Sequence, residues 1–475
     1  MVNNSDSISW ASLKLTAAKA LNALFVFGGT ALFTRIIGAD QLGTYFLFEK
    51  LLLLFAVFSN FGLSGALEKR LSEETDRNQY FATTAVLKLC IVFVLAISII
   101  AGRVQINGYL QAELASLLLV AVVIRETGQL FIRGLRGERR VGETSYLLAL
   151  KKVSWVAVGG ILSAVGFGYL GPIYGLLTGL MAIIVLGYLM VDTGFGSPSI
   201  SHAKSLLQFS KYDFFSSSVG WQIYNSLDTL LIGYFLTNVA VSQYEIAWRL
   251  SMMVMMITGS ISAVIFPSFS KLVEEGNSEK IENITKWSLV AGFLISIPAL
   301  AGSIVMGESI LGYGFGPAYV SASLVLVILV ADKSSHAIQE VYAQVIRAHD
   351  RPDICAGVTG GSVVLNATGN YLLIPRFGLL GAAIATTASF AAATIIYIVV
   401  ARRFIDIEFP WRPVSWQVLA AATMGLTLWG LQQRYFITSL FDTVAFVLVG
   451  ILVYGIVVGA HRNTREFIIQ PFTSA

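Results

Sequence analysis

Charged and reactive side chains are scarce in this sequence of 475 residues. Asp, Glu, Lys and Arg together make up 13% of the chain, whereas hydrophobic residues make up 56%, and there are two cysteines and four histidines. So few charges do not cover the surface of a soluble particle of this length, which excludes a soluble protein. Cys90 and Cys355 both fall in apolar stretches, so neither a disulfide framework nor a metal site is indicated.

The motifs of common enzyme sites are missing as well. The sequence contains no phosphate-binding Gly-rich loop with its Lys, no zinc-ligand spacing and no soluble ATPase domain. We therefore expect neither an enzyme nor a cofactor. Any transport has to draw on a substrate gradient, an ion gradient or the membrane potential.

Long apolar stretches recur along the chain from Leu13 onward. Each holds about 18 to 25 residues, enough for a helix to cross a hydrocarbon core of roughly 30 Å. The pattern predicts an all-α polytopic membrane protein with about fourteen transmembrane helices. The predicted spans cover residues 13–36, 43–66, 81–102, 112–132, 145–166, 170–191, 214–236, 240–266, 287–306, 318–341, 354–374, 378–401, 414–433 and 438–460.

Lys and Arg are unevenly distributed among the loops. With the N-terminus inside, 22 of the 32 Lys and Arg residues fall on the inner side or at inner helix ends, and four fall outside. Because cytoplasmic loops accumulate positive residues, we expect both termini to be cytoplasmic in a cell membrane, and the net charge of +4 indicates topology rather than nucleic-acid binding. The remaining six cations lie within spans: Lys19, Lys50, Lys88, Arg125, Arg249 and Lys333.

The two halves of the chain are duplicated. Tyr45 aligns with Tyr244 at an offset of 199 residues, and Arg136 aligns with Arg347 at an offset of 211. Six predicted spans separate the copies, so both copies have the same orientation, which predicts a parallel repeat around a central cavity. The predicted domains are an N-lobe of helices 1–6, a C-lobe of helices 7–12 and two C-terminal helices, at residues 1–191, 192–405 and 406–475.

Several short motifs follow one another along almost the whole chain. They are GLSGALEKRLSEE at 62–74, LDTLLIGYFL at 227–236, YEIAWRL at 244–250, IFPSFSKL at 265–272, FGPAY at 315–319 and LNATGNYLLIPRFGLLGAAIATT at 365–387. In this order they resemble the multidrug/oligosaccharidyl-lipid/polysaccharide exporter superfamily, and within it the polysaccharide-transporter branch that includes lipid-linked oligosaccharide flippases. The resemblance implies a transporter of lipid-linked glycans.

Charged residues within spans are the candidates for a binding site. A charge at the bilayer centre costs roughly 2.5–3.5 kcal/mol, so it faces a bundle interior or a water-filled cavity. Cations suit a lipid diphosphate or an acidic sugar, and Arg binds phosphate in a bidentate manner. The predicted substrate-binding residues are Lys19, Lys50, Arg125, Arg249, His336, Glu340, Asn366 and Asn370.

Each of these residues has a structural alternative. Hydrogen bonds between helices or internal ion pairs also account for polar groups in spans, and the lysines can extend to the interface instead. Asp228 and Asp332 are candidates for ion coupling or for an ion pair with a lumen cation. Asn366 and Asn370, four residues apart on one helical face, either bind sugar hydroxyls or hold two helices together.

The resemblance leads to one hypothesis and two alternatives. The hypothesis is a monomeric flippase that moves a polyprenyl-linked oligosaccharide from the inner to the outer leaflet, for surface polysaccharide or glycan assembly, by alternating access through a cationic central cavity. Its partners are the substrate, membrane lipids and, as an open option, glycan-synthesis proteins. One alternative is a cation-coupled multidrug exporter of the same superfamily, which Asp228 favours and the lack of an acid in span 13–36 opposes. The other is a lipid scramblase or a structural partner of a glycan-synthesis complex.

Overall fold

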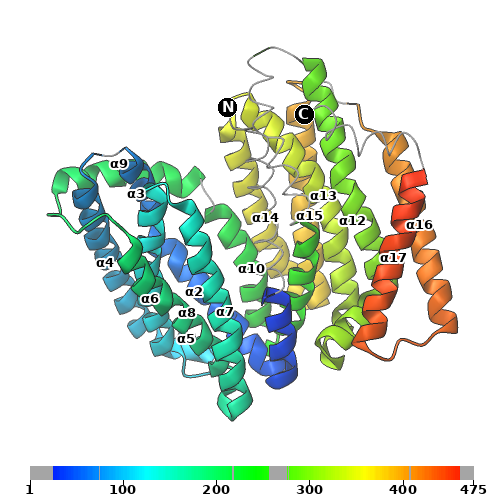
Figure 1. Ribbon diagram of the computed structural model, residues 1–475, viewed down its shortest axis with the longest axis horizontal. Coiled ribbons are helices and arrows are strands. Elements are labelled where there is room, and N and C mark those ends of the chain that lie inside the picture. The colour runs from blue at the N-terminus through cyan, green and yellow to red at the C-terminus, as the bar shows by residue number, and fades with distance from the viewer. Residues whose placement is uncertain are drawn as a thin grey trace, which may run out of the picture. The chain divides into compact units, whose positions relative to one another are not determined.

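The structure is a computed structural model that describes most of the chain (Figure 1). Its described residues are 25–73, 75–216, 219–255, 275, 278–405 and 408–460, without the side chains of 211–221. They form two compact units, unit 1 within Met1–Ser242 and unit 2 within Gln243–Ala475. The predicted boundary after residue 191 rests on the sequence repeat rather than on compactness, and it stays a prediction.

All the regular elements in the described residues are helices. Unit 1 contains the helix Phe25–Ile36, α2 (Gly38–Asn60), α3 (Leu63–Ser72), α4 (Arg77–Ala101), α5 (Arg103–Leu110), α6 (Ala115–Gly137), α7 (Val141–Leu162), α8 (Leu170–Met190), α9 (Ile200–Ser216) and α10 (Val219–Phe235). A helix over residues 238–255 follows and leads into unit 2. Unit 2 continues with α12 (Ser278–Phe315), the short 3₁₀ helix η2 (Pro317–Ala322), α13 (Ser323–Ala348), α14 (Pro352–Phe377), α15 (Leu379–Ala401), α16 (Trp411–Arg434) and α17 (Leu440–Ala460).

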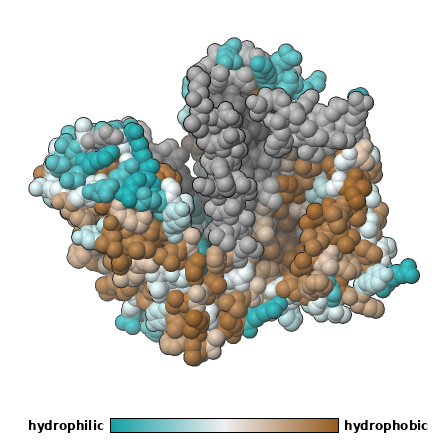
Figure 2. Space-filling view, in the orientation of Figure 1, coloured by the Kyte–Doolittle hydropathy of each residue, from teal (hydrophilic) through white to brown (hydrophobic). Residues whose placement is uncertain are grey.

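The helices are those of a polytopic membrane protein. Ten of the described helices are long and apolar enough to cross a membrane, and each of the fourteen predicted spans overlaps a helix. Apolar side chains cover the visible flank of α16 and α17, whereas polar ones gather around α9 at one end of unit 1 (Figure 2). Apolar flanks and polar ends suit helices surrounded by lipid, because helices satisfy their own backbone hydrogen bonds there. The count of fourteen stays a prediction.

The span predicted at 43–66 covers parts of two helices in the structure. The first, α2, stops within it because Phe61 adopts a left-handed conformation with φ of 39°, and the Phe61 N–H donates to the carbonyl of Val57. The chain then begins a separate helix, α3, at Leu63. A left-handed residue ends a helix, and hydropathy does not reveal such a residue when its neighbours are apolar.

The sequence repeat is also a repeat of backbone conformation. Arg139 after α6 and Asp350 after α13 stand 211 positions apart, and both are left-handed, with φ of 63° and 56°. Gly168 before α8 has φ 56° and ψ −132°, and Gly378 before α15, 210 positions later, has φ 59° and ψ −135°. The segment α6–α7–α8 in unit 1 thus has the turns of α13–α14–α15 in unit 2.

Gly378→Ala tests whether this turn depends on glycine. Side chains disfavour a φ of 59° with a ψ of −135°, and a Cβ at Gly378 meets no other atom within 4 Å, so the cost is backbone strain of about 1–3 kcal/mol. We expect a lower melting temperature for the purified protein in detergent. The control is Gly361→Ala inside α14, where a Cβ also meets no atom within 4 Å and stability is expected to be unchanged or higher. Equal melting temperatures for the two variants would contradict the assignment of strain.

Candidate functional site

Unit 1 contains a buried ion cluster that joins α4 to α6. The Lys88 ammonium lies 2.8 Å from one carboxylate oxygen of Glu126, and the Arg125 guanidinium lies 2.7 Å from the other. The side chains of Lys88 and Glu126 are 6% and 3% exposed, so Lys88 does not extend to the interface. Arg125 uses one of its five donors on Glu126 and is 16% exposed. Two cations therefore share one buried carboxylate.

In unit 2, a neutral residue stands at the repeat position of Glu126. Ala337 occupies the position of Glu126, 211 residues later, and Gly292 of α12 lies against it: a Cβ built on Gly292 would be 2.9 Å from the Ala337 Cβ. Small residues let two helices approach closely in lipid. An ion pair therefore joins α4 to α6 in unit 1, whereas small residues let α12 pack closely on α13 in unit 2. The contact between these helices can thus form without the charges.

Lys50 and Asp228 lie on neighbouring helices of unit 1. The Lys50 ammonium donates a hydrogen bond to the backbone carbonyl of Asn225, at 2.9 Å, which joins α2 to α10. Asp228 is on the same helix as Asn225 and is 3% exposed. Both predicted residues are thus inside unit 1 rather than at its surface. Lys19 lies outside the described residues.

The predicted residues Asp332, His336 and Glu340 lie four residues apart on α13 of unit 2, and this stripe divides into two parts. Asp332 pairs with its neighbour Lys333 at 2.9 Å, and both side chains are fully buried. The Lys333 ammonium also lies 4.3 Å from the ring centre of Trp248, and the His336 ring lies 4.4 Å from that of Phe390. These contacts form an ion pair enclosed by aromatic rings, which favours the structural alternative for Asp332.

The other end of the stripe is more open. Glu340 has a side chain 37% exposed and accepts a hydrogen bond from Gln344 at 3.0 Å. Arg249, on the helix over residues 238–255, pairs with Glu245 one turn earlier at 3.3 Å and is 17% exposed. In unit 2, Glu340 and Arg249 are therefore the predicted charged residues that keep some accessible surface.

Asn366 and Asn370 take part in a buried hydrogen-bond network. The Asn366 amide donates to the Thr386 hydroxyl at 3.2 Å, the Tyr244 hydroxyl lies 3.4 Å from the same oxygen, and the Asn370 amide donates to the Asn366 carbonyl at 3.0 Å. Thr386 is on α15, so the network joins α14, α15 and the helix over residues 238–255. This position favours helix packing over sugar binding.

Sequence reasoning missed the acids that hold the predicted cations. Glu126 and Glu245 are the partners of Arg125 and Arg249, and both are almost fully buried. An acid at i−4 from Arg249 was a readable signal, because such residues are neighbours on a helix. Glu126 follows Arg125 directly, a spacing that does not predict contact, and its pairing with Lys88 requires the packing of α4 on α6.

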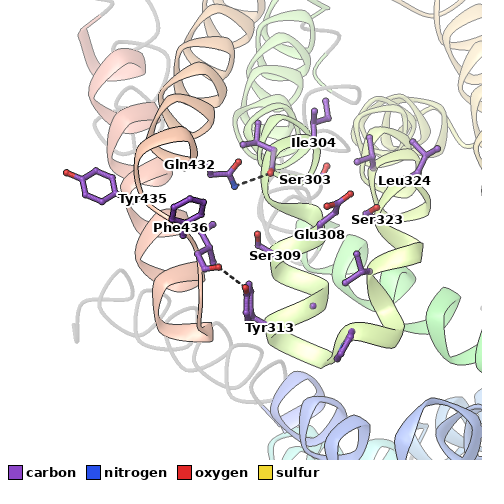
Figure 3. A pocket seen from close by; sticks show the side chains of 16 residues that line it. Ser303, Ile304, Glu308, Ser309, Tyr313, Ser323, Leu324, Gln432, Tyr435 and Phe436 are labelled. Carbon is purple, nitrogen blue, oxygen red and sulfur yellow. Dashed lines mark hydrogen bonds between the residues drawn. The ribbon is translucent and has the colours of Figure 1, made fainter.

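Two cavities of unit 2 lie apart from these residues. One of about 1150 Å³ is lined by α12, α13 and the segment after α16, with Glu308, Ser309 and Gln432 on its wall (Figure 3). Tyr313 closes one side by donating to the carbonyl of Ile437 at 2.7 Å. The other, of about 530 Å³, has an almost wholly apolar lining from α12, α13, α16 and α17. Neither cavity wall includes a predicted site residue.

Within the described ranges, no group of three or more His, Cys, Asp or Glu residues is placed to hold a metal ion.

Comparison with known proteins identifies the family of this chain. Residues 32–324 match the polysaccharide biosynthesis protein family. The chain belongs to this family. It is 34% identical over 455 residues to the probable low-salt glycan biosynthesis flippase Agl15 of Haloferax volcanii, with 96% of each chain covered. It is 28% identical over 469 residues to the probable flippase AglR of the same organism, covering 96% of this chain and 98% of the relative.

Solved structures show the same fold at low sequence identity. The lipid II flippase MurJ in an inward closed conformation matches 96% of this chain and 100% of its own, with a TM-score of 0.82 and 16% identity. An inward-facing multidrug resistance MATE transporter of the MOP superfamily matches 81% of this chain and 94% of its own, with a TM-score of 0.61 and 16% identity. This member of the polysaccharide biosynthesis protein family therefore shares its fold with both transporters.

Glu126→Gln tests the shared carboxylate of the ion cluster. The variant leaves the Lys88 and Arg125 charges buried without their common partner, whereas Lys88→Gln leaves Glu126 paired with Arg125. Because removing one partner of a buried pair costs about 3–5 kcal/mol, we expect Glu126→Gln to lower the melting temperature more than Lys88→Gln does. Glu113→Gln, which removes an exposed pair with Arg103, serves as the control and is expected to change little. A larger loss in Lys88→Gln would contradict the shared-carboxylate assignment.

Proposed function

We propose that this protein is a flippase that moves a polyprenyl-linked oligosaccharide from the inner to the outer leaflet of the cell membrane, for glycan or surface polysaccharide assembly. The observation that carries the proposal is the 34% identity, over 96% of both chains, to a probable glycan biosynthesis flippase. Family membership and the fold shared with a lipid II flippase support the same function. The N-terminus and the C-terminus are cytoplasmic in this proposal.

The proposed mechanism is alternating access through a cationic central cavity. The headgroup of the substrate enters this cavity while its lipid tail stays in the bilayer, and the two repeats rock to change the accessible side. Lys50, Arg125 and Arg249 attract the anionic phosphates, and Arg125 and Arg249 combine a charge at span depth with partly accessible side chains. Lys19, on the first predicted span, is a further proposed contact.

The polar residues of unit 2 have a secondary role in this proposal. His336 and Glu340 offer hydrogen bonds to sugar hydroxyls, Glu340 with the more accessible side chain. Asn366 and Asn370 stabilise the packing of α14 against α15, and in this proposal these helices form part of the cavity wall. Asp228 is proposed as a lumen ion pair, or as a coupling site if transport depends on H⁺ or Na⁺, whereas the enclosed pair of Asp332 with Lys333 has a structural role. Without coupling, an inside-negative potential favours outward movement of an anion by about 2.3 kcal/mol per charge per 100 mV.

Translocation in proteoliposomes tests the proposal. The substrate is a fluorescent polyprenyl-diphosphate oligosaccharide, and the readout is its appearance in the opposite leaflet. We expect protein-dependent translocation that falls about tenfold or more in the Arg125→Ala, Arg249→Ala variant, since a hydrogen bond to a charged group contributes about 1.5–3 kcal/mol. Arg125→Ala preserves the pair of Lys88 with Glu126, whereas Arg249→Ala removes the ion pair with the buried Glu245, so the melting temperature of each variant is measured beside its translocation rate.

The control is Arg103→Ala, because Arg103 is exposed. Its translocation rate is expected to match that of the wild type. Absence of translocation by well-folded wild type across several glycans, together with efflux of cationic drugs, would refute the flippase in favour of the drug exporter. Translocation that is indifferent to the double substitution would instead point to a scramblase.

A further inference from the structure

The larger cavity of unit 2 lies at the end of this unit where α16 connects to α17. Its wall consists of the last part of α12, the first part of α13 with the 3₁₀ helix between them, and residues 432 and 435–437 (Figure 3). In the proposed orientation the C-terminus is cytoplasmic, so α17 ends at the inner surface and the connection from α16 to α17 is on the outer side. We call this space of about 1150 Å³ the outer cavity.

The wall of the outer cavity suits neither a phosphate nor a lipid tail. None of its described lining residues is Lys, Arg or His, and Glu308 places an exposed carboxylate there, which repels an anion. The other cavity of unit 2 has an almost wholly apolar lining, as a hydrocarbon chain requires, whereas the outer cavity has three serines and Gln432 on its wall. A polar ligand without negative charge matches this lining.

Three polar groups on this wall have unused hydrogen-bonding capacity. Among the residues that the structure describes, none bonds to the carboxylate of Glu308 or to the hydroxyls of Ser309 and Ser323. The helices α12 and α13 are close here, since a Cβ built on Gly307 would lie 3.9 Å from the Ser323 Cβ. An ionised carboxylate accepts hydrogen bonds at both oxygens, and a hydroxyl both donates and accepts. A ligand with several neighbouring hydroxyl groups matches such a set.

An exposed aromatic ring lies beside the polar wall. Phe436, which lines the outer cavity, is 87% exposed. Its segment is tied to α12 on both sides, because Gln432 donates to an α12 carbonyl at 3.3 Å and Tyr313 donates to the carbonyl of Ile437 at 2.7 Å. The face of an aromatic ring carries partial negative charge, which attracts the C–H groups on the flat side of a sugar ring. The polar wall and the aromatic ring therefore both suit a sugar.

The size and surroundings of the outer cavity agree with a sugar chain attached to a lipid. Pockets that hold drug-sized ligands measure roughly 300–1,000 Å³, so about 1150 Å³ has room for more than one sugar ring. Ile304 and Leu324, also on the wall, are 63% and 54% exposed, as expected of apolar side chains that face lipid. A glycan can therefore lie in the outer cavity while its lipid tail stays in the bilayer.

We infer that the outer cavity binds neutral sugar residues of the lipid-linked glycan on the outer side of the membrane. Glu308, Ser309 and Ser323 bind the sugar hydroxyls, and Phe436 packs against the face of a sugar ring. The inference rests on the proposed function and deepens it, because it assigns the glycan to a wall that includes none of the predicted site residues. The carboxylate disfavours acidic sugars and the diphosphate, so the ligand class is a neutral oligosaccharide.

Binding of a free glycan to the full-length protein in nanodiscs tests this subsite. The probe is the oligosaccharide released by mild acid from the lipid-linked glycans of cells that produce the protein, labelled with a fluorophore; the release removes the lipid and the diphosphate. We expect Glu308→Ala to weaken binding at least about tenfold, equivalent to about 1.4 kcal/mol, because hydrogen bonds to an ionised group are about twice as strong as neutral ones. The fold is retained, since Glu308 is exposed.

The control for this variant is Glu113→Ala, which removes an exposed acid of unit 1. Its affinity for the glycan is expected to equal that of the wild type. Equal affinity in Glu308→Ala, or binding of acidic oligosaccharides or cationic drugs in place of neutral glycans, would overturn the inference.

Phe436→Ala tests the ring contact independently of the carboxylate. We expect weaker glycan binding, restored in Phe436→Trp, because a larger ring offers the same face to the sugar. Aromatic rings also anchor helix ends at a membrane surface, so the control is Phe441→Ala, which removes a ring of α17 that is 82% exposed and does not line the cavity. Equal losses in Phe436→Ala and Phe441→Ala would overturn the ring contact.

Cysteine labelling separates the subsite from the proposed function. Ser309→Cys in a Cys90→Ser, Cys355→Ser background is treated in right-side-out vesicles with a membrane-impermeant thiol reagent, with and without the released glycan. Labelling from outside that the glycan slows supports the subsite even if no lipid-linked oligosaccharide is translocated, in which case the proposed function fails alone. Translocation together with labelling that is absent or indifferent to the glycan overturns the inference and leaves the flippase proposal standing.

Discussion

The cost of placing a charge in hydrocarbon governs how this molecule is built. Lys88, Arg125 and Lys333 all lie within spans, and each meets a carboxylate: Glu126 for the first two and Asp332 for the third. A buried pair of this kind gives little net stability, because desolvation offsets the attraction, yet loss of one partner is expensive. The charges are therefore kept in pairs, and net stability alone does not account for them.

The repeat separates what the fold requires from what function adds. Both halves use left-handed turns after α6 and α13 and glycine turns before α8 and α15. At equivalent positions of this repeat, unit 1 has Glu126 where unit 2 has Ala337. Both copies form the same turns although the residues at these positions differ in charge, so the turns do not depend on those charges.

The sequence predicted much of the fold and less of the site, for physical reasons. Apolar stretches identified the helices because a chain segment within lipid has to satisfy its own backbone hydrogen bonds, which a helix does. The offset of 211 residues between Arg136 and Arg347 recurs in the structure, between the left-handed residues Arg139 and Asp350. Asn366 and Asn370 were recognised as one helical face, but their network requires Thr386 from another helix. Glu126 was missed as the partner of Lys88 because their contact depends on how α4 packs against α6, which hydropathy does not show.

In the proposed cycle, an anionic headgroup crosses the membrane through a positively charged interior, so that net charge moves with each transport event. The most direct test is the initial rate of outward translocation of a polyprenyl-diphosphate oligosaccharide under imposed potentials of opposite sign. The account predicts faster movement at inside-negative than at inside-positive potential, since each charge contributes about 2.3 kcal/mol per 100 mV. Equal rates at both polarities would contradict it.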